Sequence, residues 1–281
     1  MITCIILILS HDHSETTSIK NLWLKYSPLL FSSSLIQFDF FFIEYNTNIT
    51  HDYIMNQKTK ILTLKGEDSI IPGCFLKTIK SIEIIQHLYN PDFILRTNIS
   101  TIFNFKKIIP IIQKLHQRDK TRIKYFLAGP ILELETLDDV KLFIQDANKK
   151  KLIDIDSIKH KEILNSILNK KIDKKSIKYI HGIFMLMDRD SYSFLVNNYT
   201  ICNPFIDILH DDILISLVFK KNKLPLICIK NNSEHNTNMT LLNNINHNYV
   251  SNNIFFRCKI DNCYLKTYEY LKKIFEIISL F

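Results

Sequence analysis

A short polar segment, Asn98-Ile99-Ser100, follows closely on an apolar run, Phe93–Leu95, that is typical of a buried strand. The end of such a strand places small oxygen-bearing side chains at the rim of a sheet, where α/β folds bind nucleotides. Asn98 and Ser100 offer neutral oxygens, which bind a hard divalent cation much less strongly than carboxylates do. The alternative is that both residues only cap the helix that begins near Asn104, or form the turn before it.

Two adjacent carboxylates, Asp211 and Asp212, open an apolar helix pattern further along the chain. Acidic side chains are favourable in the first turn of a helix on dipole grounds alone. The other interpretation is that one of them is a general base, with a pKa set by burial and by the neighbouring carboxylate. The sequence does not decide between these roles or between the two aspartates. His210 could assist, or it could be an ordinary loop histidine.

Three other positions stand next to expected strands. Gly182 precedes an apolar strand in a chain with only four glycines, which indicates a turn or a close approach of the backbone to a ligand. Arg96 could offset phosphate charge, or it could be a plain residue at the end of a strand. Arg257 could neutralise a diphosphate, or it could form an exposed basic pair with Lys259.

Alternating strand and helix patterns must position these residues. In the first half of the chain, apolar runs predict buried strands at 5–9, 38–43, 60–64 and 93–95. Apolar residues at helical spacing predict helices at 18–26, 74–89 and 105–115. This alternation predicts an α/β fold, with a mixed, mostly parallel central sheet flanked by helices on both faces.

The second half continues the alternation less regularly. We expect strands at 124–127, 183–187 and 224–229, and helices at 190–196, 211–219 and 262–280. Two Lys-rich helices, 137–148 and 158–168, form a predicted insertion at about 135–178, and 230–249 is a polar loop. Gly129-Pro130 is expected to be a turn. With no internal repeat and no interdomain linker, residues 1–281 are predicted to form a single domain.

The composition is that of an ordinary globular protein, with 46% hydrophobic and 23% charged residues. A net charge of +8 favours anionic partners such as nucleotide phosphates. Much of the basic excess lies in 149–178 without a nucleic-acid-binding motif, so no nucleic-acid partner is expected. Six scattered cysteines without a C-x-x-C pair predict free thiols in a reducing compartment.

The apolar residues 1–10 lack a basic region and are far too short to cross a bilayer. We therefore expect no transmembrane anchor and a cytoplasmic location.

Five segments, in the same order, resemble the GT-A glycosyltransferases of the β3-galactosyltransferase/fringe type. The strand at 5–9 and Ile19-Lys20-Asn21-Leu22-Trp23 are similar to the first strand of that family and its I-R-x-T-W helix. Gly66-Glu67-Asp68 and Leu76-Lys77-Thr78 resemble the D-x-Y-x-N-L-T-x-K-T stretch.

The other three segments carry the polar residues described above. Residues 93–104 align with the K-x-D-D-D-x-F-x-N motif of the family, and residues 181–190 resemble its S-G-x-G-Y-x-L-S-R-D motif. Residues 210–215 resemble the acidic E-D-V-x-x-G segment. The resemblance covers roughly residues 3–220. It departs from the family at Asn98-Ile99-Ser100, which replaces an Asp-x-Asp that holds Mn²⁺ or Mg²⁺ against the donor phosphates.

The resemblance implies an enzyme that transfers a sugar from a nucleotide-sugar, expected to be a UDP-sugar, to a glycan or protein acceptor with inversion. It implies Asp211 or Asp212 as the catalytic base, Gly182 on the acceptor side, and Asn98 and Ser100 as a weak metal site. The implied donor-binding residues are Ser10, His11, Lys77, Arg96, Asn98, Ser100 and Arg257. Because the Asp-x-Asp is degenerate, three outcomes stay open: metal-independent catalysis, weak metal binding, or a catalytically inactive binding module.

Overall fold

The computed structural model describes residues 1–11, 14–31, 35–134, 177–207, 209–230, 245, 247–258 and 263–280. The two Lys-rich helices predicted at 137–148 and 158–168 lie outside the described residues, as does most of the predicted loop at 230–249.

An eight-stranded sheet runs through the centre of the described chain, in the order β11-β7-β10-β5-β1-β2-β4-β3. Six of these strands run parallel to one another: β1 (Ile2–Leu9), β2 (Ile36–Asn46), β4 (Ile61–Lys65), β5 (Phe93–Asn98), β7 (Leu127–Gly129) and β11 (Leu226–Cys228). The edge strand β3 (Tyr53–Asn56) and the internal strand β10 (Met185–Asp188) are antiparallel to their neighbours. The predicted mixed, mostly parallel sheet is confirmed.

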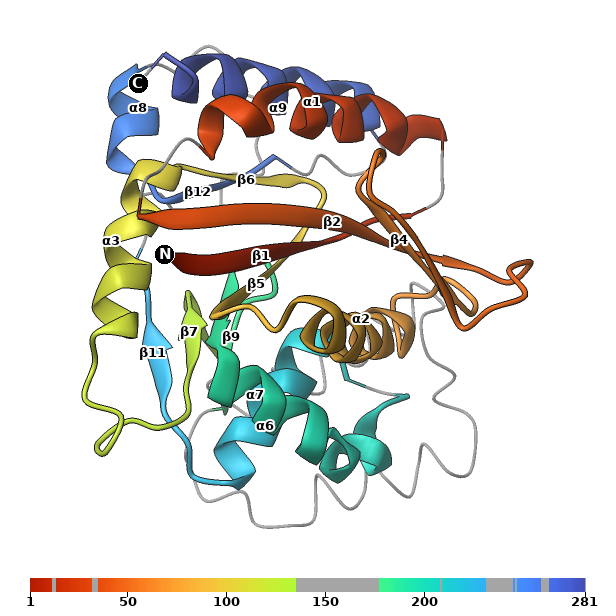
Figure 1. The fold of residues 1–281 in the computed structure, drawn as a ribbon, viewed down its shortest axis with the longest axis vertical. Coiled ribbons are helices and arrows are strands. Elements are labelled where there is room, and N and C mark those ends of the chain that lie inside the picture. Colours follow the sequence, from red (N-terminus) through yellow and green to blue (C-terminus); the bar gives the residue numbers. More distant parts are fainter. Residues whose placement is uncertain are drawn as a thin grey trace.

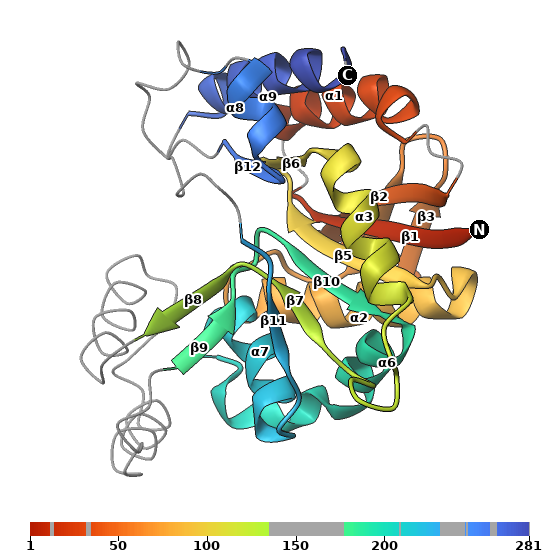
Figure 2. The same ribbon diagram turned by 90° about the vertical axis from the view of Figure 1, so that its left-hand side faces the viewer.

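Helices cover both faces of the sheet (Figures 1 and 2). On one face lie α1 (Ser14–Leu30), α3 (Phe105–His116), α8 (His247–Asn252) and α9 (Tyr264–Ile278). On the other lie α2 (Gly73–Tyr89), α6 (Arg189–Asn198), α7 (Asp211–Lys221) and the short 3-10 helix η1 (Tyr199–Phe205). The helices predicted within the described residues are therefore present, with α1 longer at both ends than expected.

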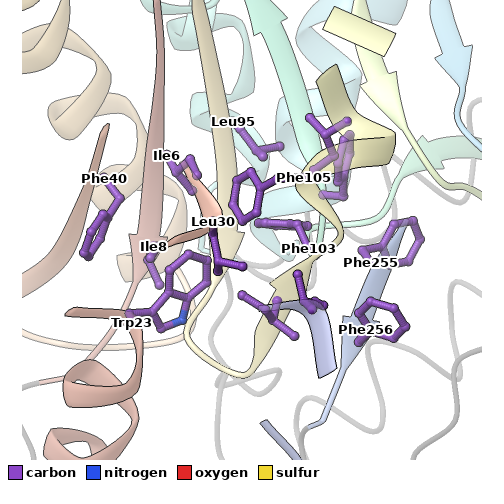
Figure 3. Packing of buried hydrophobic residues seen from close by; sticks show 14 of the residues in the cluster. Ile6, Ile8, Trp23, Leu30, Phe40, Leu95, Phe103, Phe105, Phe255 and Phe256 are labelled. Carbon is purple, nitrogen blue, oxygen red and sulfur yellow. The ribbon is translucent and has the colours of Figure 1, made fainter. Parts of the chain in front are cut away.

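Each face of the sheet has its own apolar core, because successive side chains of a buried strand point to opposite faces. On the α1 and α9 face, Trp23 packs edge-on against Phe103 and Phe275 (Figure 3 shows this region). Ile6 and Ile8 of β1 belong to this core, whereas Leu7 belongs to the core under α2 and α7. The two cores fix β1 and β5 rigidly from both sides.

Two small sheets lie beside the central one and were not predicted. β6 (Thr101–Phe103) pairs with β12 (Phe255–Arg257), which brings Arg257 opposite Thr101, next to the Asn98–Ser100 segment. β8 (Ile131–Leu134) pairs with β9 (Ile177–Ile180), so the two ends of the predicted insertion lie side by side.

Several local predictions were wrong. Gly129 is not in a turn but is the last residue of β7, where an added Cβ would lie 2.1 Å from the carbonyl oxygen of Phe184. The strand expected at 124–127 begins only at Leu127, because Phe126 N–H donates to the hydroxyl of Ser191 instead of to a neighbouring strand. Asn98 and Ser100 do not cap α3, since the N-cap is Asn104 and β6 intervenes.

Among the described helices, none is both long and apolar enough to cross a membrane.

Candidate functional site

The order in which strands are added to the sheet reverses between β1 and β5, and the candidate site lies at this point. From β1 the chain builds β2 and β4 on one side, then crosses to β5 on the other side of β1. Leu9 and Asn98 are paired at the carboxyl ends of these strands, and Ile99 N–H donates to the carbonyl of Leu9 at 3.0 Å. Ligands of open α/β sheets bind outside the carboxyl ends of the strands at such a switch point.

A charged cluster lies at the carboxyl end of β1 and contains three of the predicted donor-binding residues. The fully buried Lys77 of α2 donates from Nζ to the carbonyl of Ser10, at 2.9 Å, and to Oδ1 of Asp68, at 2.7 Å. The other oxygen of Asp68 lies 2.7 Å from Nδ1 of His11. Burial raises the pKa of Asp68, but the hydrogen bonds from His11 and Lys77 outweigh it and hold this pKa below its ordinary value.

The predicted donor residues Asn98 and Ser100 frame the turn at the end of β5. Asn98 is partly exposed, whereas Ser100 is buried and its carbonyl accepts a hydrogen bond from Cys258 N–H at 2.8 Å. Of the two structural alternatives drawn from the sequence, the turn is therefore correct. Asn98 is placed beside the end of β1, where a ligand at the switch point would lie.

Arg96 connects β5 to the predicted catalytic residues. Its guanidinium is buried and donates to the carbonyl of Gly182 and to the carboxylate of Asp211. Its Nε is buried and has no hydrogen-bond partner among the described residues. An added Cβ at Gly182 would lie 2.6 Å from Arg96 Nη1, so a larger residue here would displace the guanidinium from its partners. The guanidinium thus binds protein groups, and the strand-end position alone did not reveal this.

Asp212 differs from Asp211 in its partners. Asp211 is buried and forms an ion pair with Arg96. Asp212 is partly exposed, and its carboxylate accepts from Ile213 N–H at 2.9 Å and from Gly182 N–H at 3.4 Å. Burial of the carboxyl group, followed by the charge of Asp211, raises the pKa of Asp212 to about 7, against the lowering effects of Arg96 and the two N–H groups. This is the pKa expected of a general base near neutral pH.

Arg257 of β12 and His181, the residue before Gly182, lie close to one another beside the Asp211–Asp212 group. Arg257 Nη1 lies 3.2 Å from His181 Nε2, while His181 Nδ1 accepts from Ile183 N–H at 3.2 Å. The predicted donor residue Arg257 is therefore near the predicted acceptor-side Gly182.

Cys74, in the first turn of α2, is close enough to both charged clusters for their charges to affect its thiol. Burial raises the pKa of its thiol to about 12, and the charges that act on it are those of Asp211, Arg96, Lys77 and Asp68. The Asp68 cluster and the Asp211–Asp212 group therefore both lie near one helix end, on the same side of the sheet.

The described oxygen and nitrogen donors at this edge do not fit a dedicated divalent-metal site. Among the described residues, no three His, Cys, Asp or Glu side chains are grouped to hold a metal ion. Divalent ions at phosphate sites are held by one or two carboxylates together with phosphate oxygens. Asn98 and Ser100 supply neutral oxygens, and Asp211 is paired with Arg96. The weak metal site expected at Asn98 and Ser100 stays a prediction.

The raised pKa of Asp212 predicts a pH-dependent stability. Because this pKa lies above the ordinary 3.8, the folded state binds more protons here than the unfolded state between about pH 4 and 7. The free energy of unfolding therefore falls as pH rises through this range. We expect Asp212→Asn to be more stable than the parent protein at pH 8 by on the order of 1–2 kcal/mol, and to lose the advantage at pH 4. Urea unfolding at both pH values measures this, and an equal difference at both would contradict it.

Sequence reasoning gave no role to Asp68, His181 or Cys74. Asp68 and His181 stood inside segments that carried the family resemblance, but nothing in the sequence indicated their partners. Both contacts join residues far apart in the chain: His11 with Asp68, and His181 with Arg257.

Comparisons with known proteins identify no family. No protein-family model and no curated protein sequence matches the chain. Among solved structures, a galactosyltransferase LgtC in complex with donor and acceptor sugar analogues is 11% identical, with a TM-score of 0.37, over 76% of this chain and 70% of that chain. An active-site mutant of LgtC is 12% identical, with a TM-score of 0.36 and the same coverage. A likeness at this level carries no argument about what this chain binds or does.

Proposed function

We propose that this chain is a glycosyltransferase that uses a nucleotide-sugar, with a UDP-sugar as the donor. The single observation that carries the proposal is the meeting of two features at one edge of the sheet. These are the switch point between β1 and β5, which favours a nucleotide diphosphate there, and the partly exposed residue Asp212, whose carboxyl group has a pKa raised to about 7.

Asp212 is the base in this proposal, and Asp211 is a positioning residue. The base removes the proton of the acceptor hydroxyl as that oxygen attacks the anomeric carbon of the donor sugar, with inversion. Asp212 suits this role because the residue is partly exposed and its carboxyl group has an affinity for protons near neutral pH. Asp211 is buried against Arg96, which leaves it less able to reach a substrate.

The function is tested by incubating the protein with a panel of UDP-sugars and measuring release of UDP, with Mn²⁺ or with EDTA. We expect release from at least one donor under both conditions. The second candidate is a catalytically inactive module of the same fold that binds a glycan or a protein. The neutral Asn98-Ile99-Ser100 favours it, and the absence of both UDP binding and UDP release would decide for it.

Restoring the two carboxylates tests the donor site separately. We expect Asn98→Asp with Ser100→Asp to make UDP binding dependent on Mn²⁺, with a gain of at least about tenfold in affinity when the ion is added, roughly 1.4 kcal/mol. Calorimetric titration of UDP with and without Mn²⁺ measures this. The control is Asn248→Asp with Ser251→Asp on α8, which adds the same charges away from the switch point. An equal response of the two double variants would mean that residues 98 and 100 are not at the phosphates.

A further inference from the structure

Loss of the sugar from a UDP-sugar leaves negative charge on the diphosphate, and this charge must be stabilised during the reaction. A bound divalent ion usually does so, but the described residues at this edge do not form a dedicated site for one. Arg96 is not available either, because it already binds Gly182 and Asp211. Besides Arg257, which lies beside His181, a cation that can face the ligand is available at the end of β1.

His11 has the right position and is held in a fixed orientation. It stands two residues beyond Leu9, which pairs with Asn98. Its Nδ1 lies 2.7 Å from Asp68 Oδ2, 41% of its side chain is exposed, and Nε2 has no hydrogen-bond partner among the described residues. One ring nitrogen is therefore fixed by a carboxylate, and the other can bind a ligand.

The support behind His11 is buried. The carboxylate of Asp68 is itself fixed by Lys77, which is fully buried and bonded to the carbonyl of Ser10. The backbone carbonyl of His11 accepts from Thr16 Oγ1 at 3.0 Å and from Lys20 Nζ at 3.3 Å. These contacts to the backbone do not depend on the imidazole, so substitution of the side chain should leave the loop in place.

We propose that protonated His11, oriented by Asp68, binds the β-phosphate of the donor and stabilises the departing diphosphate where a metal ion otherwise would. This inference rests on the proposed function. When the bond between the anomeric carbon and the phosphate oxygen breaks, its electron pair stays on that oxygen, which accepts a hydrogen bond from Nε2–H. The proton of the acceptor hydroxyl goes to Asp212. Asp68 acts as a positioning residue.

The charged groups around His11 come from three packed elements and one loop. Asp68, in the loop before α2, places a negative charge beside the imidazole, and Lys77 of α2 places a positive charge on the other oxygen of the same carboxylate. Lys20 of α1 is neutralised by Glu44 of β2, with which it forms a buried ion pair. The next two residues in the sequence, Asp12 and His13, lie outside the described residues.

The test is calorimetric titration with UDP, UMP and inorganic pyrophosphate at pH 6 and pH 8, in EDTA. We expect His11→Gln to weaken binding of UDP and pyrophosphate at pH 6 by about 10-fold to 100-fold, the effect of a charge-assisted hydrogen bond, and to change UMP binding little. The same comparison is made at pH 8. UDP itself titrates in this range, so each comparison is between variants at one pH. His51→Gln, an exposed histidine after β2, is the control.

Asp68 is tested by the same titrations. Asp68→Asn should weaken binding of UDP and pyrophosphate, because the imidazole loses the carboxylate that orients it, and Asp68→Glu should restore much of the binding. If His11→Gln binds UDP and pyrophosphate as the parent does at both pH values, the inference is overturned, while turnover of a UDP-sugar would leave the proposed function standing. If the parent binds neither UDP nor a UDP-sugar, both fail. If pyrophosphate alone is bound, and through His11, the anion site stands without the nucleotide.

Discussion

Asp212→Asn is expected to lower the rate of UDP release from the donor by about 10²-fold to 10⁴-fold, the contribution typical of a general base. The amide keeps the size of the side chain and can still accept from Gly182 N–H, so UDP binding and the fold should stay intact. In the parent protein, the rate should rise with pH around an apparent pKa near 7, and this dependence should vanish in the variant.

Two further variants complete the experiment. Asp211→Asn should lower the rate through misplacement of Gly182 and Asp212. The pH dependence should persist but move to lower pH, because the charge of Asp211 no longer raises the pKa of Asp212. Asp190→Asn on α6 is the surface control, because its carboxylate is only paired with the exposed Lys120. If Asp212→Asn retains full turnover with an unchanged pH profile, Asp212 is not the base.

The course of the sheet was largely predictable from the sequence. β1, β2 and β4 are short apolar runs bounded by polar residues, and buried parallel strands have this pattern. The helices α2 and α3 showed apolar residues at helical spacing on one side. These strands and helices could therefore be predicted from local sequence patterns, without knowledge of contacts between distant residues.

The end of β5 was not predictable in this way. The apolar run stops at Leu95, but the strand continues through Arg96 and Thr97 to Asn98. Arg96 and Thr97 can be buried because their side chains form hydrogen bonds with distant residues. Arg96 donates to the carbonyl of Gly182 and to the carboxylate of Asp211, and Thr97 Oγ1 donates to the carbonyl of Ile183 at 2.7 Å. These partners lie 86 to 115 residues away in the sequence, so no local pattern indicates them.

The same long-range pairing explains the error at Gly129 and the missed strand β12. Gly129 is required by the approach of Phe184, a residue on the far side of the predicted insertion. β12 is only three residues long and exists through its pairing with β6. The candidate site is built from such contacts, so the sequence could indicate its residue types and its edge of the sheet but not which carboxylate forms the ion pair with Arg96.

Arg96→Met is expected to have the largest effect on stability, lowering the free energy of unfolding by about 3–5 kcal/mol. Removing one partner of a buried ion pair leaves the other charge buried without compensation, here on Asp211, and also leaves the carbonyl of Gly182 without its donor. Native domains are stable by only about 5–15 kcal/mol, so the variant should be close to unfolding. Urea unfolding followed by circular dichroism measures the change.

The double variant Arg96→Met with Asp211→Asn separates loss of the charge pair from loss of packing. Because both charges are then removed, we expect it to recover much of the stability lost in Arg96→Met. The matched control is Lys60→Met, which breaks a pair with Asp39 whose side chains are 25% and 35% exposed, and which should cost about 0–1 kcal/mol. If Arg96→Met costs no more than Lys60→Met, the guanidinium does not hold β5, Gly182 and α7 together. The position of Asp212 relative to the switch point would then depend on other contacts, such as Thr97 with Ile183.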